Sequence, residues 1–253
     1  MKVAVLQMRV APGDESANMA RAKSLVADAA KSGANLALLP EAFHLGWTDP
    51  SARDLADSVP NGRVAKLLSQ WAVEQRIYLC AGIVERAGDR IFNAAALFSP
   101  QGSLLLHHRK INELDIAAGL YARGDRIQVC ETEFGRIGLM ICADAFAEGR
   151  PISRALGAMG AKVILSPCSW AVTARDAHRR EPYGQLWLDN YIPVAQEYQL
   201  SIVAASNVGP ITAGPWQGRV CIGSSMAVDP HGEEIARATY GAEAEEILHV
   251  MIA

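Results

Sequence analysis

Residues 3–7 read VAVLQ and residues 35–39 read NLALL, and the segment between them carries apolar residues at helical spacing. Short apolar runs of this kind are typical of buried strands. The intervening segment predicts a helix that Ser16 or Asn18 caps and that runs to about Lys31. A strand, a helix and a second strand in this order predict a parallel strand pair with a helix on one face of the sheet.

The same alternation continues to the end of the chain. It predicts helices over residues 63–75, 151–159 and 186–198, and strands over residues 77–84, 91–99, 103–108, 126–130, 136–141, 163–166, 201–206, 224–228 and 234–238. The turn-forming sequence DPHG at residues 229–232 joins the last two strands. The pattern indicates two sheets, each covered on one face by helices. No linker or low-complexity tract interrupts it, so we expect a single domain over residues 1–253.

Composition narrows the class of protein. Half of the 253 residues are apolar or aromatic, which is enough for a large core, and the net charge is −3 with both signs interspersed. A nucleic-acid partner usually requires a clustered basic face. The N-terminus is not typical of a signal peptide, and no stretch has the apolar length of a membrane span. We therefore expect a cytoplasmic protein with no nucleic-acid or membrane partner.

The chain has five cysteines: Cys80, Cys130, Cys142, Cys168 and Cys221. Their number is odd, and their spacing to one another and to histidines is not that of a metal site. Neither a disulfide framework nor a bound metal is therefore expected. Most of these residues should be small buried hydrophobes.

Glu41 directly follows the apolar run that ends at Leu39 and Pro40. Ligand sites of α/β proteins gather at the carboxyl ends of strands. A carboxyl group that loses water there gains a higher pKa, which suits a general base. For Glu41 taken alone, a solvated acid in a loop is the alternative.

Lys110 ends the segment HHRK, which follows an apolar run at residues 104–106. A cation held at a strand end can stabilise a developing oxyanion. The alternative is a solvated basic edge that discourages strand pairing. His107 and His108 also suggest a metal site, but no third ligand is suitably spaced.

Cys142 follows the apolar strand GLMI at residues 138–141 and precedes Ala143 and Asp144. A thiol at a transition from strand to loop can face a pocket. The backbone N–H of Ala143 would then lie near the target of the thiol and form part of an oxyanion hole. A buried structural cysteine is the alternative, and Asp144 is expected to orient the loop.

A base, a cation and a thiol thus follow one another at three strand ends, and at this point the sequence resembles the nitrilase superfamily of carbon–nitrogen hydrolases. The segments LLPEAF around Glu41, HHRKI around Lys110 and GLMICADAF around Cys142 resemble its Glu, Lys and Cys motifs. The resemblance extends over nearly the whole chain, and it includes YARGD at residues 121–125 and SPCSW at residues 166–170.

The resemblance implies a four-layer αββα sandwich in which two mixed sheets are covered by helices. Such chains commonly pair across a two-fold axis, so we expect a homodimer or a higher homo-oligomer. The family needs no metal or organic cofactor. Its partner is a small-molecule substrate.

The resemblance also implies the roles of the site residues. Glu41 acts as the base, Cys142 attacks, and Lys110 with the Ala143 N–H stabilises the oxyanion. The expected reaction is hydrolysis of a small linear amide through a thioester on Cys142, which gives a carboxylic acid and ammonia or an amine. An ω-amide or an N-carbamoyl compound lies within the range of the family, and nitrile hydrolysis ranks lower.

The sequence departs from the family pattern in three places. Many members carry a second glutamate at the position that Ala117 occupies here. Glu113 and Asp115 lie nearby but out of register, so either one replaces it or the role is absent. The usual Arg-Phe-Pro-Glu after the Cys motif reads AFAE at residues 145–148, and the helix that often carries Arg-Ala-x-Glu-Asn reads VAQEY at residues 194–198. These changes suggest an uncommon substrate or an altered dimer surface.

Ser169 and Trp170, next to the proposed pocket, are expected to contact the substrate. Further aromatic residues either line the pocket or belong to the core: Phe43, Trp47, Trp187 and Trp216. Cys168 lacks a matched acid and cation and is expected to be structural. A polar loop carries Arg175, Arg179 and Arg180, which are either solvated or able to bind a substrate carboxylate.

Two other kinds of function remain open. A non-catalytic binding or scaffold protein would keep the fold, and the missing second glutamate favours it. A thiol acyltransferase would use the same thioester but pass the acyl group to an amine or an alcohol. A metallohydrolase is a more distant alternative.

Overall fold

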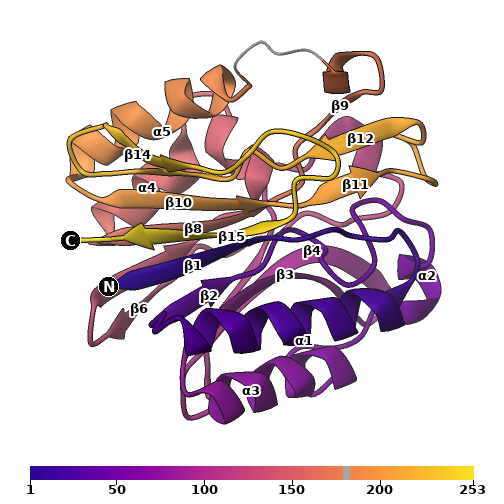
Figure 1. Ribbon diagram of the computed structural model, residues 1–253, viewed down its shortest axis with the longest axis horizontal. Coiled ribbons are helices and arrows are strands. Elements are labelled where there is room, and N and C mark those ends of the chain that lie inside the picture. The colour runs from indigo at the N-terminus through magenta and orange to yellow at the C-terminus, as the bar shows by residue number, and fades with distance from the viewer. Residues whose placement is uncertain (179–182) are drawn as a thin grey trace.

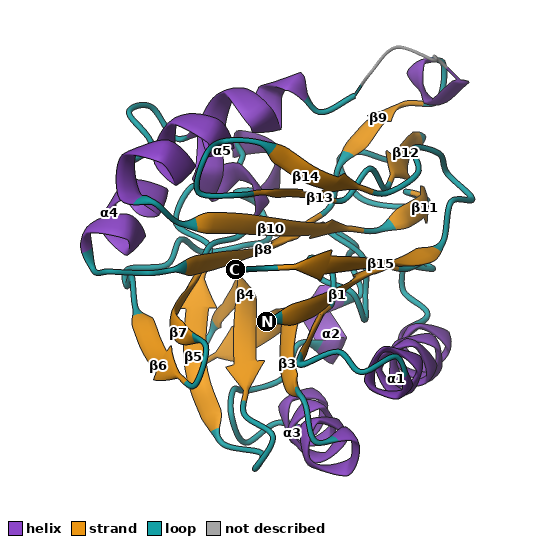
Figure 2. Ribbon diagram, turned by 60° about the vertical axis from the view of Figure 1, so that its left-hand side comes forward, coloured by secondary structure: helices purple, strands orange, loops and turns teal. Residues whose placement is uncertain are grey.

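The computed structural model describes residues 1–178 and 183–253 (Figure 1). Two sheets lie face to face in the middle of the molecule, and helices cover their outer faces (Figures 1 and 2). The covering helices are α1 (Glu15–Lys31) and α3 (Arg63–Gln75) on one side, and α4 (Pro151–Ala158) and α5 (Gln185–Tyr198) on the other. The αββα sandwich that the resemblance implied is therefore confirmed.

The first sheet has the strand order β15-β1-β2-β3-β4-β5. Its strands are β1 (Lys2–Gln7), β2 (Leu36–Leu38), β3 (Tyr78–Ala87), β4 (Arg90–Phe98), β5 (Leu104–Arg109) and β15 (Glu246–Met251). The pairs β1–β2 and β2–β3 are parallel, whereas β4, β5 and β15 join by antiparallel pairing. The parallel pair predicted at the start of the chain is thus present.

The second sheet has the order β14-β13-β10-β8-β7-β6. Its strands are β6 (Val129–Thr132), β7 (Gly135–Leu139), β8 (Val163–Cys168), β10 (Ser201–Ser206), β13 (Met226–Val228) and β14 (Glu234–Arg237). The neighbours β7, β8 and β10 are parallel, and the other pairings are antiparallel. This sheet is therefore mixed, like the first.

Several short elements were not predicted from the sequence. A small antiparallel sheet contains β9 (Ala171–Thr173), β11 (Val208–Pro210) and β12 (Arg219–Ile222). The short helices are α2 (Ala52–Leu55) and the 3₁₀ turns η1 (Asp115–Ala117), η2 (Cys142–Phe146) and η3 (Asp176–His178). Segments this short leave no readable periodicity in a sequence.

Side-chain alternation along β1 explains how one strand serves two cores. Val3 and Val5 belong to the core between the sheets, whereas Ala4 and Leu6 pack in the core beneath α1 and α3. Successive side chains of a strand point to opposite faces, so a strand buried on both faces must be apolar throughout. That requirement accounts for the continuous apolar runs in the sequence.

The start of α1 differs from the prediction. Asp14 is the cap, and its Oδ1 accepts a hydrogen bond from the N–H of Ala17 at 3.0 Å. Ser16 and Asn18 lie inside the helix, where the Asn18 amide donates instead to the carbonyl groups of Ala11 and His44. A carboxylate in this position satisfies a free N–H of the first turn and also faces the positive end of the helix dipole.

The strand before Cys142 ends earlier than predicted, at Leu139 instead of Ile141. Met140 keeps one bond to the neighbouring strand, from its N–H to the carbonyl of Leu165 at 3.1 Å, and the chain then turns at Cys142 with φ 43°. The thiol therefore stands on a tight turn rather than on the strand itself. Within residues 1–178 and 183–253, none of the helices has the length and apolar character that crossing a bilayer requires.

Candidate active site

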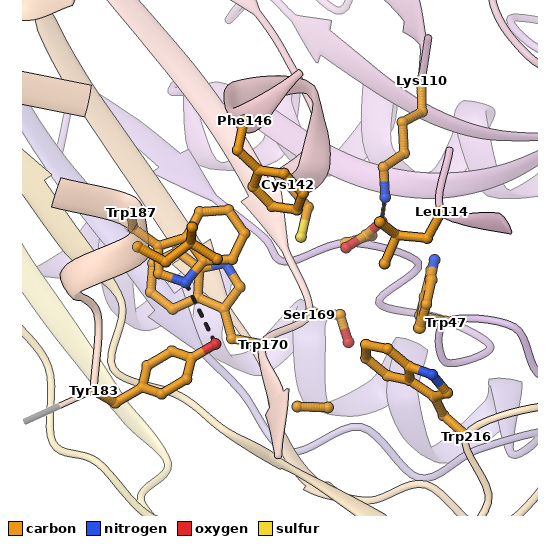
Figure 3. Close-up of a pocket in the computed structure, with 13 residues that line it drawn as sticks. Trp47, Lys110, Leu114, Cys142, Phe146, Ser169, Trp170, Tyr183, Trp187 and Trp216 are labelled. Carbon is orange, nitrogen blue, oxygen red and sulfur yellow. Dashed lines mark hydrogen bonds and ion pairs between the residues drawn. The ribbon is translucent and has the colours of Figure 1, made fainter. Parts of the chain in front are cut away.

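Four strand ends meet at one edge of the sandwich and bring together most of the predicted site. Glu41 follows β2 and Lys110 follows β5 of the first sheet, while Cys142 follows β7 and Ser169 follows β8 of the second. All four line a cavity of about 200 Å³, which also contains Trp170 (Figure 3). The cavity thus lies across the junction of the two sheets.

Glu41 is held in place by backbone contacts to both sheets. Its N–H donates to the carbonyl of Cys168 in the second sheet at 3.1 Å. From the first sheet, β3 passes directly beneath it at Gly82, where a Cβ atom would lie 2.5 Å from the Glu41 Cα. Glycine allows this close approach of two backbones. The carboxyl group itself is 1% exposed.

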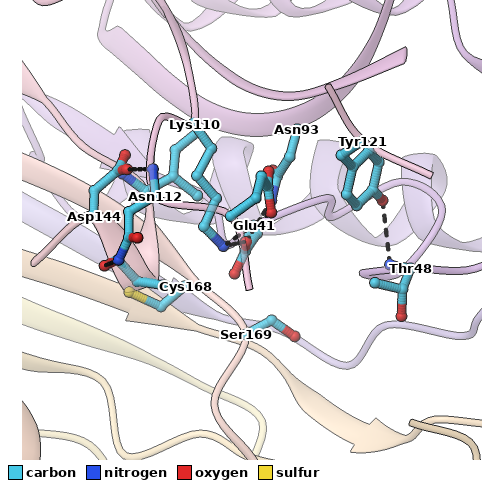
Figure 4. Close-up of polar contacts among 12 residues, drawn as sticks. Glu41, Thr48, Asn93, Lys110, Asn112, Tyr121, Asp144, Cys168 and Ser169 are labelled. Carbon is cyan, nitrogen blue, oxygen red and sulfur yellow. Dashed lines mark hydrogen bonds and ion pairs between the residues drawn. The ribbon is translucent and has the colours of Figure 1, made fainter. Parts of the chain in front are cut away.

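Lys110 and Glu41 form a buried ion pair (Figure 4). The Lys110 ammonium donates to Glu41 Oε1 at 2.7 Å, and the Asn93 amide donates to the same oxygen at 2.6 Å. Burial by itself would lower the pKa of Lys110, but the carboxylate of Glu41 and the neighbouring acidic groups outweigh it and raise that pKa above its ordinary value. Lys110 is therefore a permanent cation in the cavity.

Cys142 directs its sulfur into the cavity (Figure 3). Its positive φ is unusual for a residue with a side chain and costs on the order of 1 kcal/mol. Burial, a contact with Cys168 and the charge of Glu41 raise the pKa of the thiol well above its ordinary value, against the opposing effect of Lys110. The thiol is therefore protonated near neutral pH and needs a base before it can attack.

Asp144 ties the Lys110 segment to the Cys142 turn (Figure 4). Its carboxylate accepts from the backbone N–H groups of Ile111 and Asn112 at 3.0 and 2.8 Å, and from that of Ile141 at 2.9 Å. His108 Nε2 lies 2.8 Å from the same carboxylate. Burial alone would raise the pKa of Asp144, but these hydrogen bonds outweigh it and lower that pKa. The arrangement is that of a loop-orienting residue, as the sequence suggested.

The predicted contact residues differ in how they meet the cavity. Ser169 and Trp170 line it, whereas Ala143 is fully buried and is not among the lining residues. Only the backbone of Ala143 is available, at the first turn of η2, where N–H groups have no partner within the helix. Its carbonyl accepts from the Asn112 side chain at 2.7 Å, which fixes the orientation of this turn.

Most of the aromatic candidates line the cavity, but one does not. Trp47, Trp187 and Trp216 join Trp170 on its walls, together with several apolar residues that the sequence analysis did not single out: Leu114, Phe146, Ala171, Tyr183 and Leu186. Phe43 belongs instead to the core beneath α1 and α3. The altered segment after the Cys motif thus contributes Phe146 to the pocket.

Comparison with known proteins places this geometry in a family. The model of the family described as carbon-nitrogen hydrolase matches residues 2–253. The omega-amidase NIT2 of Mus musculus is 32% identical over 248 residues, which cover 94% of this chain and 84% of that protein. A carbon–nitrogen hydrolase structure from Helicobacter pylori superposes with a TM-score of 0.86 at 24% identity, covering 100% and 89% of the two chains.

The chain belongs to the carbon–nitrogen hydrolase family. It is an enzyme of the amidase type, as the sequence predicted, and the resemblance to the nitrilase superfamily is confirmed. An amidase from Nesterenkonia sp. AN1, 20% identical with a TM-score of 0.82, shares the fold over 100% of this chain and 93% of that one. That structure is of a Glu-to-Gln mutant of the amidase, in which acrylamide has added to the active-site cysteine.

In this carbon–nitrogen hydrolase, one of the two candidates for the second glutamate lies near Lys110. Glu113 is buried, and its Oε2 lies 3.9 Å from the Lys110 ammonium. Asp115 is exposed in η1, and Ala117 contributes no carboxyl group. Burial, opposed by Lys110 and reinforced by Glu41 and Asp144, raises the pKa of Glu113 to about 8.

The remaining predicted residues lie outside the cavity. Cys168 is buried and donates to the carbonyl of Ser166 at 3.3 Å. Arg175 is exposed, and it is not among the lining residues. Arg179 and Arg180, which were candidates for a substrate carboxylate, lie outside the residues that the structure describes, as does the Glu181-Pro182 segment after them.

Two functional side chains of this hydrolase were missed in the sequence. Asn93 interrupts the apolar run of β4, is fully buried and contacts Glu41, so an isolated polar residue inside a buried strand was the available signal. Tyr183 lines the cavity and contacts the Trp187 indole N–H at 3.4 Å. Nothing in its local sequence pattern distinguishes it.

Proposed function

We propose that the protein hydrolyses a small linear amide through a thioester on Cys142. One observation carries this proposal: the Cys142 sulfur, the Glu41–Lys110 ion pair and the start of η2 line the same small cavity. The side chains of Cys142, Glu41 and Lys110 supply a nucleophile, a base and a fixed cation, and each of these groups can promote acyl transfer.

In the first half of the reaction, Glu41 takes the proton of the Cys142 thiol while the sulfur attacks the amide carbon. The Lys110 ammonium and the Ala143 N–H stabilise the oxyanion that forms. The C–N bond then breaks, and Glu41 passes its proton to the leaving nitrogen, which departs as ammonia or an amine. The raised pKa of the thiol explains why a neighbouring base is needed.

In the second half, Glu41 takes a proton from a water molecule that attacks the thioester carbon. The same two donors stabilise the second oxyanion. When the C–S bond breaks, the carboxylic acid leaves and the proton on Glu41 returns to the Cys142 sulfur. The Lys110 ammonium donates to Glu41 at 2.7 Å and has the Glu113 carboxyl group 3.9 Å away, so acidic groups surround the cation in both halves.

The proposal is tested by intact-protein mass spectrometry after incubation with a panel of small amides, with ammonia release measured in parallel. We expect a mass increase equal to the acyl group in the wild type and none in Cys142→Ala. Cys130→Ala, which removes a half-buried thiol on β6, is the matched control and should behave like the wild type. Ammonia release that survives Cys142→Ala would overturn the proposal.

Two alternative functions, a non-catalytic binding protein and a thiol acyltransferase, can be weighed against this proposal. The non-catalytic alternative rested on the missing second glutamate, and the position of Glu113, 3.9 Å from the Lys110 ammonium, counts against it. A thiol acyltransferase would form the same thioester, and it differs from a hydrolase in passing the acyl group to an acceptor other than water. Addition of hydroxylamine to the amide reaction should yield mainly carboxylic acid if water is the preferred acceptor, and mainly hydroxamate if it is not.

We also propose that copies of the chain pair into a homodimer or a higher homo-oligomer. The support for this proposal is the family resemblance noted in the sequence. Size-exclusion chromatography with light scattering gives the molar mass in solution directly. A mass of 27.1 kDa, that of one chain, at micromolar concentration would contradict pairing.

A further inference from the structure

The walls of the cavity are unusually rich in tryptophan. The chain has five tryptophans, and four of them line this single cavity. They form two facing groups with the Cys142 sulfur between them (Figure 3). One group contains Trp170 and Trp187, and the other contains Trp47 and Trp216. We call them the inner wall and the outer wall.

The inner wall is a preformed flat surface. The Trp170 and Trp187 rings stack with their centroids 4.6 Å apart and an angle of 20° between their planes. Phe146 packs against Trp187 at 5.3 Å, and the Tyr183 hydroxyl lies 3.4 Å from the Trp187 indole N–H. Because both tryptophans are almost fully buried, these rings are fixed before any ligand arrives.

The outer wall is also ordered by ring contacts. Trp216 meets Trp47 edge to face, with centroids 4.8 Å apart and planes at 72°. The Arg219 guanidinium lies over the outer ring of the pair, 4.3 Å from the Trp216 centroid. Trp216 stands on the segment between β11 and β12 and is only half-buried, so it closes the cavity from the solvent side.

The charges along the cavity bear on which acyl groups it can hold. Among the lining residues that the structure describes, the charged side chains are Glu41 and Lys110, and they are paired with each other. Aromatic rings present the negative part of their quadrupole from their faces. A carboxylate on the acyl chain would therefore be repelled by the ring faces of the inner wall, whereas a neutral flat group would gain ring contacts there. The cations that the structure places on the aromatic rings of the cavity, Lys110 and Arg219, lie at the outer wall, over Trp47 and Trp216.

The size of the cavity matches one aromatic ring. A cavity of about 150 Å³ lined by apolar side chains binds benzene, and the cavity here is about 200 Å³. We infer that the substrate is a neutral aryl amide, in which a phenyl-sized ring lies between the two walls and is joined to the carboxamide directly or through one carbon. This inference rests on the proposed function, since the amide carbon must reach Cys142.

The test compares kcat/KM for phenylacetamide and benzamide with the values for acetamide and for succinamate, a monoamide that carries a carboxylate. One methylene in an apolar pocket changes kcat/KM by roughly 10–200-fold. We therefore expect the better aryl amide to exceed acetamide by at least about 100-fold and succinamate by more. Equal or higher values for acetamide or succinamate would overturn the inference and leave amide hydrolysis in place.

Trp216→Ala tests the outer wall, because Trp216 is half-buried and its loss should leave the sandwich folded. We expect the ratio of kcat/KM for phenylacetamide over acetamide to fall about 10-fold or more, and Trp216→Phe to restore most of it. Leu55→Ala, an exposed apolar residue on α2, is the control and should keep the wild-type ratio. An unchanged ratio in Trp216→Ala overturns the role of the outer wall.

Binding to Cys142→Ala separates the inference from the proposed function. Tryptophan fluorescence should change on addition of phenylacetamide, because four of the five tryptophans line the cavity, and acetamide should produce no saturable change at the same concentrations. Saturable binding of phenylacetamide without turnover in the wild type would reject the hydrolytic function and keep the ring-binding cavity. Turnover of acetamide with no saturable binding of phenylacetamide would reject the ring-binding cavity and keep the hydrolytic function.

Discussion

The Glu113 carboxyl group lies 3.9 Å from the Lys110 ammonium, which Glu41 also binds at 2.7 Å. One buried cation therefore stands between two carboxyl groups. Two buried carboxylates near one cation do not ionise independently, since each charge raises the pKa of the other group. The pKa of Glu113 at about 8 means that it is largely protonated at neutral pH. Glu113 then lies beside Lys110 without cancelling its charge.

The stability of the protein should fall with rising pH because of Glu113. Its pKa is raised from 4.5 to about 8 by folding, so the folded state holds this proton more tightly than the unfolded state. The stabilisation is complete below about pH 4.5 and is lost as the pH rises to 8. We expect Glu113→Gln to remove about 5 kcal/mol of this pH dependence, measured by urea unfolding across that range. Asp115→Asn, at an exposed neighbour, should keep the wild-type slope.

Asp144→Asn should weaken both the fold and the active site. The buried Asp144 carboxylate accepts hydrogen bonds from three backbone N–H groups and faces His108. The NH₂ group of an asparagine at this position would face N–H donors and could not accept their hydrogen bonds. We expect a loss of roughly 3–5 kcal/mol at neutral pH. Folding lowers the pKa of Asp144, so its contribution is present above the unfolded value and is lost as the pH falls through the folded one. The gap between variant and wild type in denaturant titrations should therefore narrow in acid; a constant gap would contradict this account.

Lys110→Met should reduce kcat with a smaller change in KM. Methionine keeps the length of the side chain but removes the cation that stabilises the oxyanion. Loss of one such donor lowers kcat by about 10²–10³-fold. Steady-state kinetics on the best amide measures the effect, with Lys66→Met on the exposed face of α3 as the control. A rate within a factor of two of the wild type would remove Lys110 from the mechanism.

The backbone at Cys142 should be strained, because its φ is positive. Its φ of 43° is easy for glycine and costly for residues with a Cβ atom. We expect both Cys142→Gly and Cys142→Ala to be inactive, with the glycine variant more stable by about 1 kcal/mol. Urea unfolding midpoints of the two variants give the comparison directly. Equal stability, or a more stable alanine variant, would show that the turn is relaxed.

The sequence pointed to three candidate residues that line one cavity, because each of them follows an apolar strand. Glu41, Lys110 and Cys142 all stand where such a run stops, and strand ends at one edge of a sheet converge in space. Long elements such as α3 and β10 matched the predicted ranges for the same reason, since their periodicity extends over several turns or a full buried strand. Both successes rest on patterns that are local in sequence.

The path of the chain between Lys110 and Tyr121 was not readable in this way. This stretch contains only the short turn η1, and its course is set by long-range bonds such as those from the backbone of Ile111 and Asn112 to Asp144. Whether Glu113 or Asp115 faces Lys110 depends on that course. The aromatic walls were equally hidden, because Trp47 and Trp216 are 169 positions apart and meet only in the folded chain.

The hydrogen bond from the Glu41 N–H to the carbonyl of Cys168 has a broader consequence. It joins the two sheets at the point where the first carries Glu41 and Lys110 and the second carries Cys142. Core side chains such as Leu38 and Leu165 pack between the two sheets and set the distance between them. The packing of the core therefore also sets the distance between the candidate site residues of the two sheets. A displacement of about 1 Å at reacting atoms can cost 10²-fold in rate. We therefore expect a core substitution that leaves the protein folded to lower turnover before it measurably lowers stability. The packing of the interior then matters for activity as well as for the fold.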